Sequence, residues 1–351
     1  MDVGGLGKIR SYMQGEPNRF EEDEADHMDG FRWAAKAQGV SLVHQNDGLF
    51  EFLSKNYKIG VMRNMLTHLV TEEAVRVCRD KTRALECLKK KGLPTPFSRY
   101  FAPDTGFEAA LNFYRDCGVD SLVVKPADAR AGSGITTTIV SDQAFREAWG
   151  YAKESLTLRQ SPIILEEKCK GIDVRAIVVA GRFVCAATRV PAHVIGDGVS
   201  TIARLIEKKN QDRAGNPCHR QHPIKTMPNL TEIPAKAEVR FLTELVNVHQ
   251  GGEALDVTDM LSKPLRNLSV DATRSVKGLG VAGVDMIVED LGHDKARVIE
   301  LNTHCNFKIH YYPMYGLRRN PAEAVVAHMK RHARFRRYVP AGLKLALRRL
   351  L

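Results

Sequence analysis

The stretch that decides the fold is Gly283-Val-Asp-Met-Ile-Val-Glu-Asp-Leu-Gly-His-Asp-Lys-Ala-Arg-Val-Ile-Glu-Leu-Asn302. Residues 284–288 and 297–302 are largely apolar, and the polar segment between them predicts a hairpin of two strands. Successive strand residues point to opposite faces, so Glu300 and Asn302 share one face. Asp285 interrupts the first strand in the same way. The hairpin therefore predicts two carboxylates and an amide close together on paired strands.

This set of oxygen ligands suits a hard cation. Mg2+ prefers carboxylate and amide oxygens, especially where it is also bound by phosphate oxygens. The alternative is that the acids sit at frayed strand ends in solvent. The hairpin alone leaves both readings open.

The composition indicates a soluble globular protein. The chain has 351 residues, of which 44% are hydrophobic and 26% charged, enough for two or three packed units. No apolar run reaches the roughly 18–20 residues of a transmembrane helix, and residues 1–20 lack the apolar core of a signal peptide. The seven cysteines include no CxxC pair, which favours reduced thiols in the cytoplasm over a disulfide framework.

The net charge of +11 implies attraction for anions, and much of the excess is C-terminal. The basic residues there are Lys330, Arg331, Arg334, Arg336, Arg337, Lys344, Arg348 and Arg349. Residues 336–351 form a basic amphipathic tail that could meet a membrane surface, an acidic carrier protein or tRNA. We favour the alternative, a terminal helix packed on its own domain with a solvated basic face.

Along the chain, helices and strands are mixed, and some strands form hairpins, which predicts an α/β or α+β class with antiparallel sheets. Residues 1–24 are expected to be a poorly specified lead-in, and residues 1–75 as a whole to complete a small α/β unit. A second hairpin is expected from 173–179 and 183–189, with Asp173 and Arg175 on one face. Residues 211–236 are polar and contain proline, so we expect a loop there.

Four features suit nucleotide chemistry and occur in a sensible order. Lys81 and Lys125 offer positive charge, and the Gly132-Ser133-Gly134 loop can bring backbone N–H groups close to phosphates. Residues 166–169, Glu-Glu-Lys-Cys, follow an apolar strand where backbone groups can bind an adenine edge. The fourth feature is the hairpin. Each is weak alone, because the loop is neither a P-loop nor a dinucleotide fingerprint.

Taken together, these motifs resemble the ATP-grasp superfamily of carboxylate–amine ligases, in particular the ATP-grasp part of cyanophycin synthetase and of bifunctional glutathione synthetases. The resemblance runs from about residue 30 to residue 330. The motifs that carry it are Asp80-Lys81, Gly92-Leu-Pro-Thr-Pro96, Val123-Val-Lys-Pro126, Gly132-Ser-Gly-Ile135, Leu165-Glu-Glu-Lys-Cys-Lys-Gly-Ile-Asp-Val-Arg175, Thr188-Arg-Val-Pro-Ala-His-Val-Ile-Gly-Asp-Gly-Val-Ser-Thr-Ile202, Gly283-Val-Asp285 and Glu300-Leu-Asn302.

The resemblance implies a nucleotide held between two α/β subdomains with antiparallel sheets. It places an ATP-grasp domain at 76–335, with a lid subdomain at about 118–170 and a metal and substrate subdomain at about 171–335. It implies ATP and one or two Mg2+, with Mn2+ as a substitute. It also implies small amino-acid or peptide substrates and a homo-oligomer, a dimer or a tetramer.

The resemblance further implies a role for each site residue. Phosphate binding falls to Lys81, Lys125 and the loop of Gly132, Ser133 and Gly134; adenine and ribose binding to Glu166, Glu167, Lys168, Cys169 and Asp173; metal binding to Asp285, Glu300 and Asn302; and stabilisation of the transferred phosphoryl group to Arg175 and Arg189. The expected activity is amide-bond formation between amino acids or short peptides through an acyl phosphate, giving ADP and phosphate. The alternative is a ligase-like binding module for a substrate on a carrier protein or tRNA, recruited by the basic tail.

The sequence departs from the family pattern after Asn302. Related sequences tend to carry small residues and proline there, whereas this chain continues Thr-His-Cys-Asn-Phe-Lys-Ile-His310. His304, Lys308 and His310 thus lie where the substrate loop runs and are candidate substrate contacts. The large extra domains of the two resembled enzymes are missing from this sequence, which makes a single ligation more expected than polymerisation. Neither Cys218, His219 and His222 nor the 304–310 group has four ligands at a familiar zinc spacing, so zinc is not expected.

Overall fold

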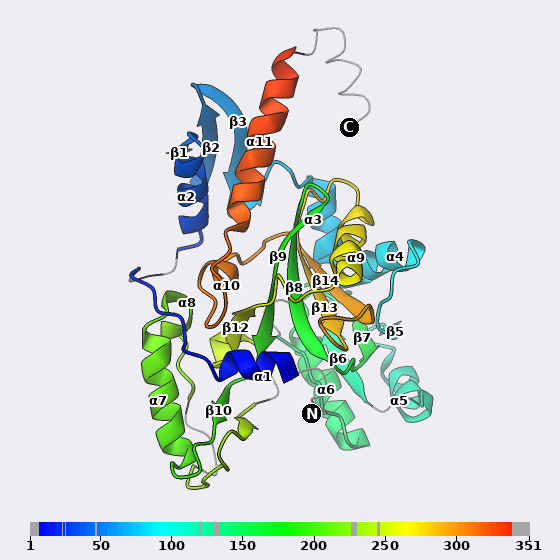
Figure 1. Ribbon diagram of the computed structural model, residues 1–351. Coiled ribbons are helices and arrows are strands. Elements are labelled where there is room, and N and C mark those ends of the chain that lie inside the picture. The colour runs from blue at the N-terminus through cyan, green and yellow to red at the C-terminus, as the bar shows by residue number, and fades with distance from the viewer. Residues whose placement is uncertain are drawn as a thin grey trace.

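The computed structural model describes residues 7–22, 24, 26–45, 48–118, 121–128, 133–225, 230–243 and 246–338 (Figure 1). Of the expected site residues, Gly132 lies outside this part of the chain. So do residues 339–351, which make up most of the expected basic tail. The fold is mixed α/β with antiparallel sheets, as predicted.

The N-terminal unit is a four-stranded antiparallel sheet of order β1-β2-β3-β4, with helices packed against it. Its elements are α2 (Asp29–Ala37), β1 (Ser41–His44), β2 (Leu49–Ser54), β3 (Tyr57–Arg63) and β4 (Leu66–Thr67). The last helix, α11 (Pro321–Tyr338), contacts α2 and β3, so the C-terminal part of the chain returns to this unit (Figure 1).

The expectation of an unstructured lead-in over residues 1–24 is wrong for residues 7–13. They form α1 (Gly7–Met13), and Ile9 and Met13, four residues apart on one helix face, are 1% and 2% exposed in the main core. The sequence hides this helix because it is short and carries only two large apolar anchors.

A second unit is built on a three-stranded antiparallel sheet of order β5-β7-β6. Its elements and the two helices that precede it are α3 (Glu72–Arg79), α4 (Lys81–Lys90), β5 (Ser98–Phe101), α5 (Phe107–Asp116), β6 (Leu122–Pro126), α6 (Asp142–Glu154) and β7 (Ile163–Glu167). Leu122, Val124 and Leu165 point into the core beneath α5 and α6. Their neighbours Lys125 and Glu166 therefore lie on the opposite face. The expected lid region, 118–170, supplies β6, α6 and β7, whereas β5 and α5 precede it.

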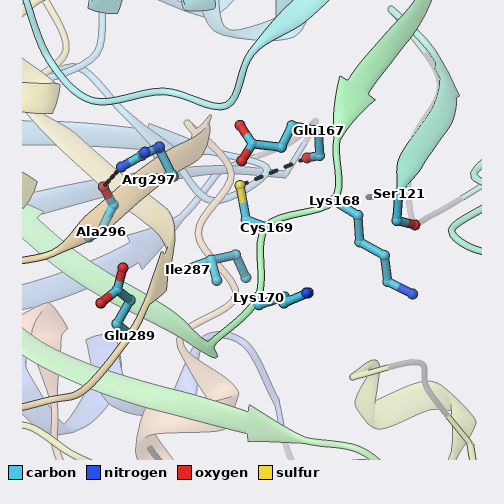
Figure 2. Close-up of a pocket in the computed structure, with 9 residues that line it drawn as sticks. All are labelled: Ser121, Glu167, Lys168, Cys169, Lys170, Ile287, Glu289, Ala296 and Arg297. Carbon is cyan, nitrogen blue, oxygen red and sulfur yellow. Dashed lines mark hydrogen bonds between the residues drawn. The ribbon is translucent and has the colours of Figure 1, made fainter. Parts of the chain in front are cut away.

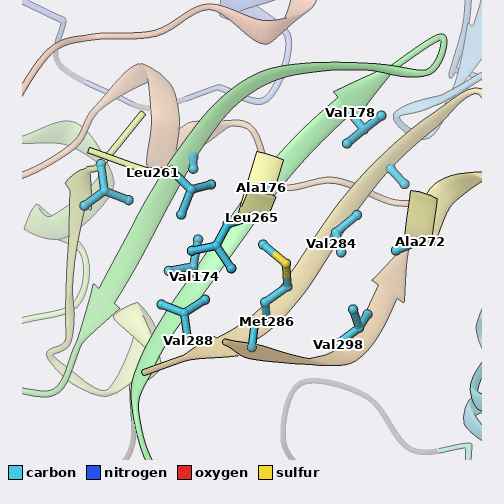
Figure 3. Close-up of a cluster of buried hydrophobic side chains, with 14 of the residues drawn as sticks. Val174, Ala176, Val178, Leu261, Leu265, Ala272, Val284, Met286, Val288 and Val298 are labelled. Atoms are coloured by element: carbon cyan, nitrogen blue, oxygen red, sulfur yellow. The ribbon is translucent and has the colours of Figure 1, made fainter. Parts of the chain in front are cut away.

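The largest sheet has five antiparallel strands in the order β12-β9-β8-β13-β14. The strands are β8 (Ile172–Val179), β9 (Arg182–Val190), β12 (Glu253–Asp256), β13 (Val281–Val288) and β14 (Ala296–Asn302). The predicted hairpin is confirmed, with Asp285 directly opposite Glu300. One face packs under α9 (Lys263–Arg274) through apolar residues such as Val174, Met286 and Leu265 (Figure 3).

The other face of this sheet is divided. Ile177, Val179 and Val281 are buried against α11 and the N-terminal unit. Towards the other end of the same strands, the face carries charged residues. Because the apolar half is covered by helices, the charged half is where a ligand can approach.

Beyond the β12 edge lie β10 (His193–Ile195), α7 (Ile202–Ala214), α8 (Pro217–Arg220), β11 (Val239–Phe241), the 3-10 helix η3 (Val248–Gln250) and α10 (Lys308–Tyr311). The loop expected over 211–236 is wrong for 211–214 and 217–220, which are helical. The helical pattern of α7 continues through Lys209 and Arg213, and both are buried. Because both residues are charged, the sequence shows no apolar pattern at these positions. Inside the fold, Glu253 forms ion pairs with both.

Among the helices of the described residues, none is long and apolar enough to cross a bilayer.

Candidate active site

The charged half of the five-stranded sheet carries two acids that are paired with two arginines. Arg175 donates from Nε to Oδ1 of Asp285 at 2.7 Å and from Nη2 to Oδ2 at 2.6 Å. Arg189 forms the same two-pronged pair with Asp173, at 2.6 and 2.8 Å, and reaches Asp285 Oδ2 at 3.2 Å. Planar guanidinium groups favour such paired contacts with carboxylates. The four side chains form one network across β8, β9 and β13.

The strand register explains this network. Arg175 lies directly opposite Asp285 on β8 and β13, and Glu300 lies opposite Asp285 on β14. Burial by itself disfavours the charged carboxylate of Asp285, but Arg175 and Arg189 outweigh burial and hold the pKa of Asp285 below its ordinary value. Asp285 is therefore ionised at neutral pH, although its side chain is only 7% exposed.

The predicted metal set lies on one face, but its members differ in their surroundings. Asp285 is occupied by the two arginines, whereas the described part of the chain gives the Glu300 carboxylate no hydrogen bond or ion pair. Asn302 Nδ2 is buried without a hydrogen-bond partner. Among the described residues, no group of three or more His, Cys, Asp or Glu side chains is placed to hold a metal. Any cation here would combine carboxylates with the Asn302 amide.

On the facing sheet, Lys125 and Glu166 form a buried ion pair. Lys125 Nζ lies 2.6 Å from Glu166 Oε1, and the side chains are 6% and 5% exposed. Glu166 Oε2 is buried without a hydrogen-bond partner. A buried carboxylate oxygen without a hydrogen bond destabilises the protein unless a ligand donates a hydrogen bond to it.

Lys81 is brought to the same place by the start of α4. Asp80 caps this helix by accepting from the N–H groups of Thr82 and Arg83, and Lys81 N donates to the carbonyl of Ala127 after β6. Burial lowers the pKa of Lys81, Glu300 opposes this effect, and Lys125 adds to it. Lys81 is thus electrostatically coupled to residues of both facing sheets.

The small-residue loop after β6 is described from Ser133 onward. Gly134 has φ +72°, and a Cβ there would lie 2.9 Å from the Pro126 ring, so this position requires glycine. Ser133 Oγ lies 3.3 Å from Ser155 Oγ.

A cavity of about 310 Å3 opens between the strand that leaves the second unit and the ends of β13 and β14 (Figure 2). Its lining residues are Ser121, Glu167, Lys168, Cys169, Lys170, Ile287, Glu289, Ala296 and Arg297. Glu167 also accepts from the N–H of Phe97 at 3.2 Å. Burial raises the pKa of the Cys169 thiol to about 11, so it is neutral.

Three of the expected adenine-binding residues therefore line one cavity. Ile287 and Arg297, which lie opposite each other on the hairpin, were not among the residues expected from the sequence. Strand alternation contained the signal for Ile287, because Ile287 lies two residues after Asp285 and so shares its face.

The three residues expected to contact substrate lie at different depths. His304 is exposed, Lys308 is half-buried at the start of α10, and His310 is 2% exposed. Burial lowers the pKa of His310 to about 3, with a further contribution from Arg175 and Arg189, and its Nδ1 contacts the Cys185 thiol at 3.5 Å. His310 is therefore a buried, neutral imidazole.

Sequence comparison relates the chain to two groups of ligases. It is 32% identical over 269 residues to the cyanophycin synthetase of Synechocystis, a match covering 72% of this chain and 30% of that protein. It is 29% identical over 307 residues to the glutathione biosynthesis bifunctional protein GshAB of Listeria innocua, covering 83% of this chain and 39% of that protein. The chain thus spans well under half of either relative. No protein-family model matches it.

Structure comparison agrees on the fold. The bifunctional glutathione synthetase of Pasteurella multocida superposes with a TM-score of 0.63 at 22% identity, over 87% of this chain and 44% of that one. The likeness is therefore one of overall fold. The chain therefore resembles the cyanophycin synthetases and the bifunctional glutathione synthetases in sequence, and it shares its fold with the latter.

Proposed function

We propose that the chain is an ATP-dependent ligase that joins the carboxylate of an amino acid or short peptide to an amine, giving ADP and phosphate. The observation that supports this is the convergence of Lys81, Lys125 and Glu166 with the Asp285 network from facing sheets. The sequence relatives are themselves named as a synthetase and a biosynthetic protein.

In this proposal the nucleotide lies at the lid end of the cleft. The ammonium groups of Lys81 and Lys125 offset phosphate charge, and the loop at Ser133 and Gly134 covers the phosphates. Glu166 Oε2, which is buried without a donor, would accept from the exocyclic amine of adenine. The base then occupies the cavity lined by residues 167–169.

The residues present fit a hard divalent cation. Glu300 and Asn302 share a face with Asp285, Glu300 forms no hydrogen bond or ion pair within the described chain, and the set contains only oxygen ligands. Glu300 and Asn302 would hold Mg2+, with Asp285 reached through its less occupied Oδ1. When bound, Mg2+ would neutralise phosphate charge. Mn2+ has the same preference for oxygen and would substitute.

The chemistry proceeds in two displacements. A substrate carboxylate oxygen attacks the γ-phosphorus, the bond to the β-phosphate oxygen breaks, and ADP leaves. The amine then attacks the acyl carbon, phosphate leaves with the bonding electron pair, and the nitrogen loses a proton. Arg175 and Arg189 stabilise the charge on the transferred phosphoryl oxygens, because fixed guanidinium groups in a buried site need little reorganisation. Asp173 and Asp285 keep both guanidinium groups oriented.

The test is phosphate release from purified protein with ATP and Mg2+ against pools of amino acids and dipeptides, followed by mass spectrometry. A product lighter than its summed substrates by one water establishes ligation. Turnover should vanish in Lys125→Ala and Glu300→Ala and persist in Lys263→Ala, an exposed position on α9. Unchanged turnover in both site variants, or tight ATP binding without phosphate release in any pool, would refute the proposal.

The homo-oligomer stays a prediction. So does recruitment of a carrier protein or tRNA by the basic tail, because residues 339–351 lie outside the described chain.

A further inference from the structure

A short connection between α6 and β7 supports the end of strand β6, which carries Lys125. This connection includes residues 157–161. It contains a turn of its own, because the N–H of Ser161 donates to the carbonyl of Leu158 at 2.9 Å. Other donors of the same segment reach back in the sequence to Asp128, the third residue after Lys125.

The side chain of Asp128 is fully engaged with this segment. Its Oδ1 accepts from the N–H of Thr157 at 3.1 Å, and its Oδ2 accepts from the N–H of Leu158 at 2.8 Å and from the Ser161 hydroxyl at 2.9 Å. The Thr157 hydroxyl also donates to the Asp128 carbonyl at 3.5 Å. Hydrogen bonds to an ionised carboxylate are stronger than those between neutral groups. Asp128 is therefore a firm anchor for the backbone that follows β6.

The anchored backbone meets the start of α4. The N–H of Ala127 donates to the carbonyl of Pro162 at 3.0 Å, and the carbonyl of Ala127 accepts from the N–H of Lys81 at 3.3 Å. The first N–H groups of a helix have no acceptor inside the helix and require acceptors from elsewhere. Asp80 supplies the acceptor for the second and third N–H groups of α4, and Ala127 supplies the acceptor for the first. Because α4 contacts β14, the bond between Lys81 and Ala127 joins the second unit to the five-stranded sheet.

The charge of Asp128 is unexpected at this place. A carboxylate close to residues that bind phosphate repels the phosphate, so its presence there requires a compensating role. In this structure its three donors offset the charge. Burial lowers the pKa of Lys81, whereas Glu300 and Asp128 act in the opposite direction and favour the ammonium form. Asp128 thus acts on Lys81 through the backbone and through its charge.

The competing interpretation is that Asp128 serves only the fold of the turn at 157–161. Its removal would then destabilise the second unit, and any effect on ATP binding would be independent of Lys81. The two interpretations therefore differ in whether the effects of Asp128 and Lys81 on ATP affinity are coupled.

We propose that Asp128 is a positioning residue for ATP, which fixes the Ala127 carbonyl and thereby holds Lys81 in place for the phosphates. This inference rests on the nucleotide site of the proposed function. The sequence alone gives no sign of it, because the donors to Asp128 lie 29–33 residues later in the chain.

The test measures the Kd of ATP with Mg2+ by isothermal titration calorimetry without the other substrates, so that no turnover is needed. Asp128→Ala should raise the Kd about tenfold, and Ser161→Ala, which removes one donor and keeps the carboxylate, by about two- to threefold. Asp116→Ala, at an exposed position at the end of α5, is the matched control and should leave the Kd within about twofold of wild type. In a Lys81→Met background, Asp128→Ala should change the Kd by less than about twofold, because the group that it positions is gone.

An unchanged Kd in Asp128→Ala would overturn the positioning role. So would the same tenfold rise in the wild-type and Lys81→Met backgrounds, which would assign Asp128 to the fold of the turn alone. If Asp128→Ala does not fold, Ser161→Ala in the two backgrounds decides in the same way. ATP binding without phosphate release in any substrate pool would refute the ligase function and leave this test intact, whereas a wild-type protein that does not bind ATP would refute both.

Discussion

The buried Lys125–Glu166 pair allows stability and nucleotide binding to be separated. With side chains only 6% and 5% exposed and 2.6 Å between the charged atoms, neither group can recover hydration if its partner is removed. Removing one partner of a buried pair typically costs about 3–5 kcal/mol, whereas replacing both by apolar residues of similar volume is often neutral. Lys125→Met and Glu166→Leu should therefore each destabilise the second unit strongly, and the double variant should regain most of the loss.

Trp149 makes the measurement local. The chain has two tryptophans, and Trp149 packs in the core of the second unit while Trp33 lies in the N-terminal unit. In a Trp33→Phe background, urea unfolding followed by Trp149 fluorescence reports on the unit that carries the pair. For a slope of about 2 kcal/mol/M, a loss of 3 kcal/mol moves the midpoint by about 1.5 M urea.

The double variant then distinguishes structure from binding. It should unfold within about 0.5 M urea of the parent and yet fail to bind ATP, because the lysine charge and the Glu166 acceptor are both gone. Additive destabilisation by the two substitutions would refute the coupling. Undiminished ATP binding by the folded double variant would remove the pair from the nucleotide site.

Three further predictions concern other charged groups. Burial lowers the pKa of Lys81, and Glu300 opposes that effect. ATP affinity should therefore fall with rising pH at values below the ordinary lysine pKa. In ATP titrations between pH 7 and 10, Glu300→Gln should move this fall to still lower pH. The lowered pKa of Asp285 stabilises the folded state above the ordinary aspartate pKa, and this contribution is lost as pH falls through the lower folded value. Asp285→Asn should therefore cost about 3–5 kcal/mol at pH 7 and flatten the acid limb of a stability–pH profile, and an unchanged acid limb would contradict the assignment. The Arg318 guanidinium lies 4.6–5.0 Å from the ring centroids of Phe20, Trp33 and Tyr312, and it also pairs with Glu22. Arg318→Ala should therefore lower the free energy of unfolding by about 1–2 kcal/mol and expose residues 14–28 to limited proteolysis. Equal protease resistance of the variant and the wild type would show that the contact is dispensable.

Alternation along the strands was enough to predict the polar face. A period of two places Glu300 and Asn302 on one face, the expected hairpin brings Asp285 next to them, and the same rule applied to 173–179 places Asp173 beside Arg175. What the sequence does not contain is the register between the two hairpins. Without this register, Asp285 could be assigned to metal binding, but its two hydrogen bonds with Arg175 could not be predicted.

Buried charge accounts for the helix that was missed at residues 211–214. Lys209 and Arg213 occupy core positions of α7, where a sequence reading expects apolar residues. Glu253, fully buried on β12, neutralises them from about 40 residues away. Long-range pairing of this kind has no local signature, so the end of a helix was taken for a loop. Local rules find elements whose cores are apolar and miss those completed by ion pairs.

The N-terminal segment has a consequence for how the chain is made. Asn18 bonds to the carbonyls of Pro313 and Gly316, residues nearly 300 positions later, and α1 packs in the same core as Met314. A ribosome adding about 5–20 residues per second needs about 15–60 s to cover that separation. During that time the carbonyl groups that hold Asn18 are missing, and the core that contains Ile9 and Met13 is incomplete. Nascent-chain pulldowns should therefore find chaperones on this segment until residues 313–316 have left the exit tunnel.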